Sequence, residues 1–306
     1  MARRKTTRTG MTARIIDGKL LSAQIRQQVS SDVQALKAMN RSVRLAAILV
    51  GSSPAARVYA DNQARTFAQA GVEYQLHELP EHTTQAELDA VLTKLAKDPC
   101  VTGIMIHLPL PPQINTQQTQ YHIDILKDVE GVNPANIGNV LYGHPIIAPC
   151  TALAAVALID TTAVPLQGAE VTVVGASRIA GRPAALLLTE RGATVTVCHI
   201  HTRDLAMHTR RAEILVVAVG KPGLIQPFHV RPGAVVIDIG INRVTATDAT
   251  GKSVTKTVGD VDFPAVSETA SWITPVPGGV GPVTVAMLLK NTVRAARLVH
   301  GLDQPF

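Results

Sequence analysis

The sequence predicts an α/β protein of two domains, each built around a mostly parallel sheet. Its 306 residues suit about two domains. Short apolar segments such as 44–51 (RLAAILVG) alternate with segments of helical periodicity, which is the order expected of βαβ units. A second series begins near residue 150, and a glycine closes its first strand, as is typical of a dinucleotide-binding domain. Aromatic residues make up only 3% of the chain, so the cores are expected to be aliphatic.

The first series of elements occupies residues 21–111. An amphipathic helix over 21–40 precedes the strand at 44–51. The next helix is predicted to begin after Ser53, an N-cap residue followed by Pro54, and to end at Gly71. The remaining elements are a strand over 72–80, a helix over 83–98 that starts with threonine, and a strand over 101–111 that ends in a proline-rich loop.

The second series predicts a Rossmann-like domain with a parallel sheet. Its expected strands are 169–175, 193–199, 213–220 and 233–241, and its expected helices follow a turn within 176–192 and span 203–212. A final helix over 281–299 is expected to return to the N-terminal domain and to close the cleft between the two domains.

The charge and hydropathy of the chain argue against nucleic-acid and membrane partners. The formal net charge is +6, but Arg3, Arg4, Lys5 and Arg8 lie in the first ten residues, which leaves +2 for the rest. We therefore interpret residues 1–11 as a basic, flexible tail. No apolar run approaches the ~20 residues of a membrane span.

The cysteines indicate a reducing compartment. Cys100, Cys150 and Cys198 form no C-x-x-C pair and leave an odd thiol over. This pattern favours reduced thiols in a cytoplasm, with no structural disulfide and no zinc or other metal site.

A cofactor-binding turn is predicted at residues 173–183 (VVGASRIAGRP). The strand ends at Gly175, and a helix begins a few residues later, so its first N–H groups are expected to be unpaired and available to a phosphate. The pattern is G-x-S-x-x-x-G rather than G-x-G-x-x-G, so alone it equally describes an ordinary tight turn. The order strand, turn, helix, strand favours the dinucleotide site.

Two further loops carry possible ligand contacts. The second strand of the Rossmann-like series ends in CHIHTR, where an acidic residue would normally bind the ribose of NAD. His199, His201 and Arg203 instead favour the 2′-phosphate of NADP, although a solvated loop explains them as well. The loop over 273–284 is rich in proline and glycine, which suits close approach to a flat ligand or a hinge between domains.

Several motifs in order carry a resemblance to a known family. They include RIIDGK, IHLPLPPQIN, KDVEGVNPANIG, PCT, VVGASRIAGRPAALLL, PGAVVIDIGIN and ITPVPGGVGPVTVAMLLKNT, and the match covers nearly everything from residue 12 to 300 in order. This ordered set resembles the bifunctional methylenetetrahydrofolate dehydrogenase–cyclohydrolase family. The resemblance implies a folate-binding catalytic domain formed by 12–149 plus 283–301, an NAD(P)-binding domain over 150–282, and a homodimer through the latter. It implies oxidation of 5,10-methylenetetrahydrofolate to the 5,10-methenyl form with NADP or NAD.

The resemblance also implies which residues form the two sites. The expected catalytic residues are Tyr59, Gln63, His107 and Glu130. The expected folate contacts are these four together with Leu108, Pro109, Pro277, Gly278, Gly279 and Thr284. The expected cofactor contacts are Gly175, Ala176, Ser177, Arg178, His199, Ile200, Gly220 and Ile241.

The chain departs from the family at several of these positions. Gln63 stands for the family's lysine, His107 for its glutamine and Glu130 for its aspartate, and only Tyr59 is unchanged. Glutamine can bind through hydrogen bonds but cannot shuttle a proton. We therefore expect a weak or lost cyclohydrolase step unless His107 supplies the acid–base group, and a simple wall of the pocket is the other interpretation of this histidine. Glu130 keeps the charge of aspartate on a longer side chain.

The cofactor contacts have changed as well. Ala176 and Ile200 replace an arginine and a serine that commonly hold the 2′-phosphate, which leaves the choice between NADP and NAD open. Two other functions fit the same changes. One is a folate-dependent methylene transferase that performs no hydride transfer, and the other is a non-catalytic folate-binding homologue.

Overall fold

The computed structural model of the protein describes residues 12–51, 54–247 and 253–304. The described chain separates into two compact units, each with its own sheet. The 155–281 unit contains Ala155–Gly281 and the described residues before Leu20. The 20–154 unit contains Leu20–Ala154 and the described residues from Pro282 onward.

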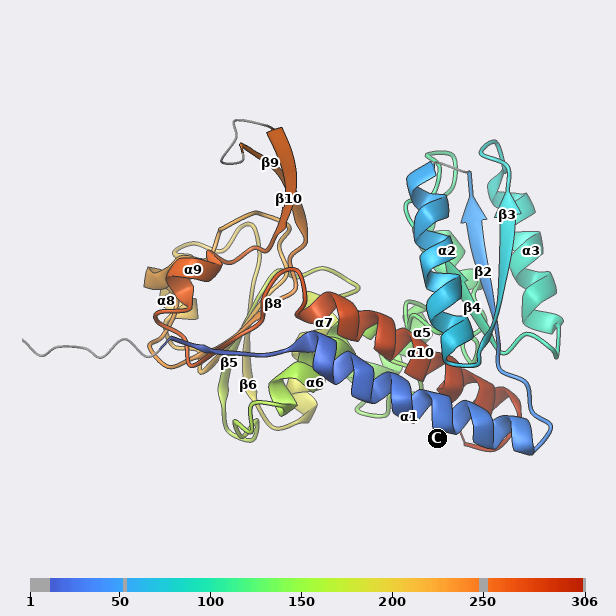
Figure 1. Cartoon of the computed structure of the whole chain (residues 1–306), viewed down its shortest axis with the longest axis horizontal. Coiled ribbons are helices and arrows are strands. Elements are labelled where there is room, and N and C mark those ends of the chain that lie inside the picture. The colour runs from blue at the N-terminus through green and yellow to red at the C-terminus, as the bar shows by residue number, and fades with distance from the viewer. Residues whose placement is uncertain (1–11, 52–53, 248–252, 305–306) are drawn as a thin grey trace, which may run out of the picture. The chain divides into compact units, whose positions relative to one another are not determined.

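A three-stranded parallel sheet forms the centre of the 20–154 unit. Its order is β3-β2-β4, with β2 at Arg44–Val50, β3 at Glu73–Leu79 and β4 at Gly103–Ile106. Helices α2 (Pro54–Gln69) and α3 (Gln85–Lys97) lie on opposite sides of this sheet (Figure 1). The sheet buries β2 on both faces, as the apolar run at 44–51 predicts.

Helix α3 begins with a capping box. Thr84 accepts a hydrogen bond from the Glu87 N–H, and the Glu87 carboxylate accepts one from the Thr84 N–H. Its apolar face, with Leu88 and Leu92 fully buried, packs in a core cluster with Ile48 and Ile104 of the sheet. The predicted start of this helix at its threonines is therefore confirmed, since the capping box satisfies N–H groups that the helix leaves unpaired.

Two long helices complete the 20–154 unit. Helices α1 (Gly18–Ala38) and α10 (Val280–Val299) lie side by side (Figure 1), and Ser22 Oγ donates to the Pro282 carbonyl at 3.0 Å. The buried amide of Asn291 in α10 donates to the carbonyls of Val129 and Ala148. The final helix therefore returns to this unit, as predicted. Shorter helices α4 (Thr116–His122) and α5 (Pro134–Leu141) follow β4, and α6 (Cys150–Asp160) belongs to the 155–281 unit from Ala155 onward.

A six-stranded parallel sheet forms the 155–281 unit, in the order β1-β11-β8-β7-β5-β6. The strands are β1 (Arg14–Ile15), β11 (Trp272–Ile273), β8 (Val235–Asp238), β7 (Ile214–Val217), β5 (Glu170–Val174) and β6 (Thr194–Cys198). Strand order reverses beside β5, because β6 lies on one side of it and β7 on the other. This is the point at which doubly wound sheets bind ligands beyond the carboxyl ends of their strands.

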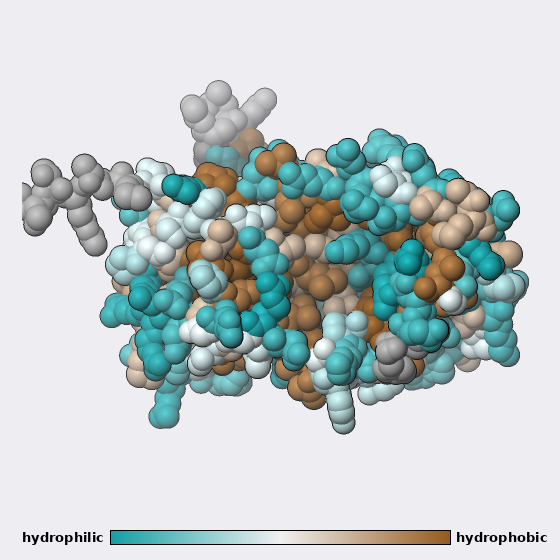
Figure 2. All heavy atoms as spheres, turned by 90° about the horizontal axis from the view of Figure 1, so that it is seen from below, coloured by the Kyte–Doolittle hydropathy of each residue, from teal (hydrophilic) through white to brown (hydrophobic). Residues whose placement is uncertain are grey.

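The remaining elements of this unit are short. They are α7 (Gly181–Glu190), α8 (Leu205–Thr209), η1 (Pro227–His229), α9 (Phe263–Val266) and a hairpin of β9 (Asn242–Thr247) and β10 (Ser253–Val258). The face shown in Figure 2 carries hydrophilic side chains with hydrophobic ones among them.

The structure differs from the sequence predictions in three places. Residues 14–15, which the resemblance assigns to the folate-binding domain, form an unpredicted strand, β1, that pairs in parallel with β11 in the other sheet. The helix expected over 203–212 is confined to Leu205–Thr209, because the Glu213 N–H must already bond the Glu170 carbonyl as the chain enters β7. The β9–β10 hairpin was not predicted at all.

The described residues contain no group of three or more His, Cys, Asp or Glu side chains arranged to hold a metal ion. None of the helices in the described part of the chain combines the length and the apolar character needed to cross a membrane. The basic tail predicted at 1–11 lies outside the described residues.

Candidate active site

Three side chains meet in the 20–154 unit, and two of them are predicted site residues. Gln63 comes from α2, and His107 directly follows β4. The hydroxyl of Tyr74, on β3, donates to Gln63 Oε1 at 3.1 Å and lies 3.0 Å from His107 Nε2. Tyr59 lies one helical turn before Gln63 in α2, but its side chain is outside the described part of the structure, so the predicted Tyr59–Gln63 pair stays a prediction.

The meeting point is buried. Gln63 is 5% exposed and His107 6% exposed. The His107 N–H donates to the Ile48 carbonyl at 2.8 Å, which extends the β2–β4 pairing and fixes the backbone of the site. Burial lowers the pKa of His107, because removing the imidazolium from water disfavours its charge. A neutral imidazole is therefore the dominant form at neutral pH.

His107 also forms part of the wall of a cavity of about 410 Å³. The predicted folate contacts Leu108 and Pro109 line the same cavity, together with Gly51 and Glu81. Leu108 is 52% exposed, so an apolar surface is open to a ligand there. The structure thus places His107, Leu108 and Pro109 along one hollow, and their contact with folate stays a prediction.

The Glu130 carboxylate accepts a hydrogen bond from the N–H of Ile106, the last residue of β4. Burial raises the pKa of Glu130 to about 7, and the neighbouring charge of Asp128 adds to the rise. Asp128 is itself fully buried and accepts hydrogen bonds from the Asn133 N–H at 2.8 Å and Asn136 Nδ2 at 2.9 Å. Sequence reasoning missed Asp128, although its position two residues before Glu130 was a usable signal.

The predicted phosphate turn is formed by very close backbone packing. Gly175 has φ +113°, and a Cβ there would lie 2.1 Å from the Ala218 carbonyl oxygen. A Cβ on Gly181 would lie 1.8 Å from the Gly175 carbonyl oxygen. Both positions therefore require glycine, and the loops after β5 and β7 touch at the strand-order reversal.

The start of α7 differs from the prediction. The Gly181 N–H donates to Ser177 Oγ and the Arg182 N–H donates to the Ser177 carbonyl, while Pro183 has no N–H. The first helical turn therefore does not offer the unpaired donors that we expected, because the turn before it already caps the helix. A phosphate at this edge would be met by the turn itself and by the exposed Arg178.

The loop after β6 adds an exposed cationic and imidazole surface. Strands β5 and β6 pair in parallel up to Val174 and Cys198, so this loop and the Gly175 turn leave the same edge of the sheet. Ile200 is 94% exposed, His199 and His201 stack edge to face at 5.9 Å, and Arg203 is exposed.

Asp260 organises the next predicted cofactor loop. Its Oδ2 accepts from the N–H groups of Val219 and Gly220, at 2.7 and 2.9 Å, and its Oδ1 accepts from Asn242 Nδ2. The N–H of Gly220 is thus engaged within the protein. Ile241 is 67% exposed beyond the end of β8. The sequence analysis did not predict a role for Asp260. The sequence around it, Gly259-Asp260-Val261, does not distinguish this aspartate from others in the chain.

The remaining predicted folate contacts are divided between the two units. In the 155–281 unit, Gly278 has φ +111°, and Gly279 packs so closely that a Cβ on Gly18 would lie 1.8 Å from its carbonyl oxygen. Pro277 belongs to the same loop. Thr284 lies in α10 and belongs to the 20–154 unit.

Comparison with known proteins identifies the chain's relatives. The NAD(P)-binding domain of tetrahydrofolate dehydrogenase/cyclohydrolase matches residues 149–300, and the catalytic domain of the same family matches 16–130. The bifunctional protein FolD of Moorella thermoacetica is 47% identical over 287 residues, which are 94% of this chain and 100% of that protein. The Rhodobacter capsulatus FolD is 49% identical over 284 residues, 93% of each chain.

This chain belongs to the tetrahydrofolate dehydrogenase/cyclohydrolase family.

Solved structures of the family share the fold. A bifunctional FolD enzyme from Campylobacter jejuni matches with a TM-score of 0.88 and 41% identity, over 94% of this chain and 99% of that one. The Trypanosoma brucei enzyme, complexed with NADP cofactor and inhibitor, matches with a TM-score of 0.87 and 35% identity, over 95% and 99%. The family, the two-domain α/β fold, the NAD(P)-binding domain and the place in folate one-carbon metabolism are therefore confirmed, and the relatives favour the dehydrogenase over the transferase alternative.

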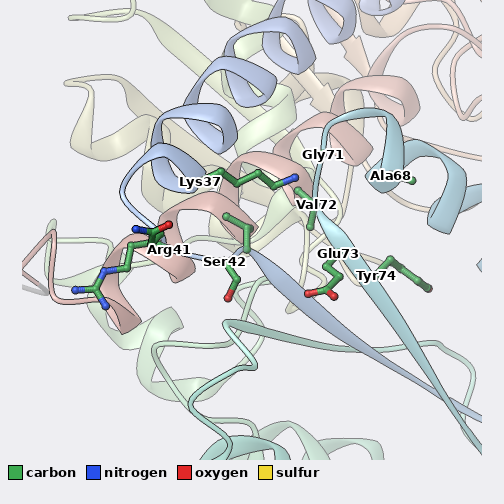
Figure 3. Close-up of a pocket in the computed structure, with 10 residues that line it drawn as sticks. Lys37, Arg41, Ser42, Ala68, Gly71, Val72, Glu73 and Tyr74 are labelled. Carbon is green, nitrogen blue, oxygen red and sulfur yellow. The ribbon is translucent and has the colours of Figure 1, made fainter.

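A second, larger cavity of about 750 Å³ lies at the opposite end of β3 from Leu79 (Figure 3). Lys37, Arg41 and Glu73 line it, and so does Tyr74, which extends from β3 away from Arg41. None of the predicted site residues lines this cavity. Tyr74 is thus the residue that the second cavity shares with the Gln63–His107 meeting point.

Proposed function

We propose that this chain oxidises 5,10-methylenetetrahydrofolate to 5,10-methenyltetrahydrofolate with NADP or NAD. The observation that carries the proposal is the match of both family domains, in order, to a chain that keeps the cofactor turn at Gly175. Hydride leaves the carbon between N5 and N10 with its electron pair, and the folate nitrogens stabilise the resulting cation. The protein therefore mainly positions the reactants.

The cofactor, when bound, supplies the hydride acceptor. We assign its binding to the carboxyl edge of the parallel sheet, where the Gly175 turn fits a close-lying phosphate. Arg178 and Arg203 are the exposed cations suited to a 2′-phosphate in place of the family's arginine. The assigned cofactor residues are Gly175, Ala176, Ser177, Arg178, His199, Ile200, Gly220 and Ile241.

Most of the proposed folate contacts belong to the 20–154 unit. Gln63, His107 and Glu130 are its proposed catalytic residues with Tyr59, and Leu108 and Pro109 line its cavity. We assign Pro277, Gly278, Gly279 and Thr284 as further folate contacts. With these assignments the folate-binding domain is 12–149 plus 283–301, except that β1 pairs in the sheet of the other unit, and the cofactor domain is 150–282.

The hydrolytic step is proposed to be slow and to depend on His107. Water adds to the methenyl carbon and loses a proton, and N5 must gain a proton as its bond to that carbon breaks. Gln63 cannot perform either transfer. His107 is the buried neutral base next to it, and general acid–base catalysis of this kind contributes about 10²–10⁴-fold.

Two further assignments follow the family. We propose a homodimer formed through the 155–281 unit, which light scattering on the eluting peak would test against a monomer mass. We propose a cytoplasmic location, in keeping with Cys100, Cys150 and Cys198, which form no disulfide in the described structure.

The deciding experiment follows nicotinamide absorbance with 5,10-methylenetetrahydrofolate and either NADP or NAD. Steady reduction of one cofactor would establish the dehydrogenase and its preference. No reduction by protein that binds the folate would refute the proposal and favour a silent homologue.

A further inference from the structure

Two buried aspartates are neighbours at the carboxyl edge of the six-stranded sheet. Asp238 ends β8 and is 3% exposed, and Asp260 follows β10 and is fully buried. The Asp260 N–H donates to Asp238 Oδ1 at 3.1 Å. A Cβ on Gly240 would lie 2.2 Å from Asp260 Cγ, and one on Gly259 would lie 1.8 Å from Asp238 Oδ2. Glycine at both positions therefore lets the backbone enclose the two carboxylates.

In the described structure, every hydrogen bond to these carboxylates comes from an N–H group. The donors to Asp260 are the N–H groups of Val219 and Gly220, at 2.7 and 2.9 Å, and Nδ2 of Asn242, at 2.8 Å. Asp238 likewise accepts from three backbone N–H groups. Among the described residues, neither aspartate forms an ion pair with a lysine, arginine or histidine. The negative charge of Asp260 is therefore held by neutral dipoles, with no cation to cancel it.

The strand order places this charge on the nicotinamide side of the proposed cofactor site. In a doubly wound sheet the dinucleotide lies across the point where the strand order reverses, with its adenosine half toward the second strand. That strand is β6 here, so the nicotinamide half belongs on the other side of β5, toward β7 and β8. The proposed cofactor contact Gly220 follows β7, and its N–H donates directly to Asp260. Asp260 therefore lies directly behind a loop that is proposed to contact this half of the cofactor.

We propose that Asp260 is a specificity-determining residue that shifts the preference of the cofactor site toward the oxidised form of the nicotinamide cofactor. This inference rests on the proposed function. The oxidised nicotinamide ring carries a positive charge and the reduced ring is neutral, while the rest of the cofactor is the same in both. A buried carboxylate near the ring attracts the charged form, and this attraction is screened less inside a protein than in water.

The backbone around Asp260 supports the same preference. The N–H groups of Val219 and Gly220 are directed at the carboxylate, so their positive ends are not offered to the nicotinamide ring. In the proposed reaction the oxidised cofactor is the reactant and the reduced cofactor is the product. A fixed negative charge at this place therefore favours binding of the reactant and release of the product.

The test measures the Kd of NADP, NADPH, NAD and NADH with the full-length protein, by calorimetry and without folate. Asp260→Asn removes one charge and keeps the shape of the side chain. Its amide oxygen can accept from the loop after β7, and its amide nitrogen can donate to Asn242 once that amide turns over. We expect the ratio of the Kd of the reduced form to that of the oxidised form to fall about tenfold. An unchanged ratio in the folded variant overturns the proposal.

Glu268→Gln is the matched control. It removes one negative charge from an exposed position in the same unit, where water screens the charge. The ratio of the two Kd values should therefore stay at the wild-type value. An equal fall in Glu268→Gln and Asp260→Asn would show that only the net charge of the protein matters, and would overturn the proposal.

A second variant, Asn242→Leu, separates the charge of Asp260 from the shape of the loop. It removes one donor and keeps the carboxylate, so the ratio should equal or exceed the wild-type value. A lower ratio would show that the bonds of the loop set the preference, and this outcome overturns the proposal even where Asp260→Asn folds poorly. The fluorescence of Trp272, the single tryptophan of the chain, reports the folding of this unit in each variant.

The outcomes also distinguish this inference from the proposed function. A wild type that binds none of the four cofactors refutes the proposed function itself. A wild type that reduces a cofactor in the nicotinamide assay, with a ratio that does not respond to Asp260→Asn, refutes this inference alone.

Discussion

The Glu130 carboxylate accepts a hydrogen bond from the Ile106 N–H at 3.4 Å, one residue before His107. This single bond only partly offsets the loss of water around the carboxylate and the nearby charge of Asp128, so the pKa of Glu130 is raised to about 7. Glu130 is thus an acid that titrates near neutral pH, at the position where the resemblance predicts the family's aspartate.

Glu130→Gln should stabilise the fold at alkaline pH. A carboxyl group whose pKa rises from 4.5 to about 7 on folding binds more protons in the folded state over that window. Its contribution to the free energy of unfolding is present below pH 4.5 and is lost as pH rises through 7, a change of up to about 3 kcal/mol. Urea unfolding at several pH values should show that the free energy of unfolding of the variant increases relative to that of the wild type as pH rises.

Burial also raises the pKa of Asp238, to about 6. Asp238 is present in both the wild type and the variant, so its titration cancels in the difference between their free energies of unfolding. A difference in unfolding free energy that is flat from pH 4 to 8 would contradict the raised pKa of Glu130.

Gln63→Lys should restore the missing acid–base group. The lysine amine would lie beside Tyr74 at a position that is 5% exposed, where burial lowers its pKa toward neutrality. We expect the rate of methenyltetrahydrofolate hydrolysis to rise about tenfold or more while the dehydrogenase rate changes little. Gln63→Met, of similar length and without a titratable group, is the control. Equal hydrolysis by both variants, with folate binding intact, would count against this account.

His107→Gln should lower hydrolysis and leave hydride transfer nearly unchanged, since only hydrolysis needs a proton acceptor. Burial lowers the pKa of His107, so its neutral form persists below the ordinary value of 6.5. In the wild type, the rate of hydrolysis is therefore expected to fall only below about pH 6.5 as His107 becomes protonated. The variant should show no such fall. If the rates of both steps and the fall at low pH survive the substitution, His107 is only a wall of the cavity.

Ala176→Arg should increase preference for NADP. A charge-assisted bond to the 2′-phosphate contributes about 1.5–3 kcal/mol, or roughly a tenfold to hundredfold lower Kd. NAD lacks that phosphate, so its Kd should hardly move. Titration of both cofactors by calorimetry would measure the ratio, and equal tightening for both would place residue 176 away from the 2′-phosphate.

The order of elements was readable from the sequence because it depends on local chemistry. The N-cap at Thr84, the apolar run of β2 and the glycine after β5 each act over a few residues. The return of α10 was also expected from the order of elements, but its partners were not, since the hydrogen bonds from Asn291 reach residues 129 and 148.

Tyr74 shows what the sequence did not reveal. It lies in a half-exposed strand of mixed polarity, and nothing within a few positions indicates its contact with Gln63 or His107, 33 positions later. Asp260 was missed for the same reason, because the N–H groups that it accepts belong to residues about 40 positions earlier. Ser177 was predicted to lie near the phosphate. Its Oγ instead accepts a hydrogen bond from the Gly181 N–H at the start of α7, and this depends on the backbone conformation of the turn, which the motif alone does not specify.

The pairing of β1 with β11 also has a consequence for how the chain emerges from the ribosome. Arg14 pairs opposite Trp272, 258 positions later, so at about 5–20 residues per second the first strand waits roughly 13–50 s for its neighbour. The sheet β3-β2-β4, by contrast, is complete once residue 106 has been made. Since β11 and α10 both lie within residues 272–299, this one stretch supplies the strand that joins β1 to β8 in one unit and a long helix of the other. Neither hydrophobic core is therefore complete until residues 272–299 have left the ribosome.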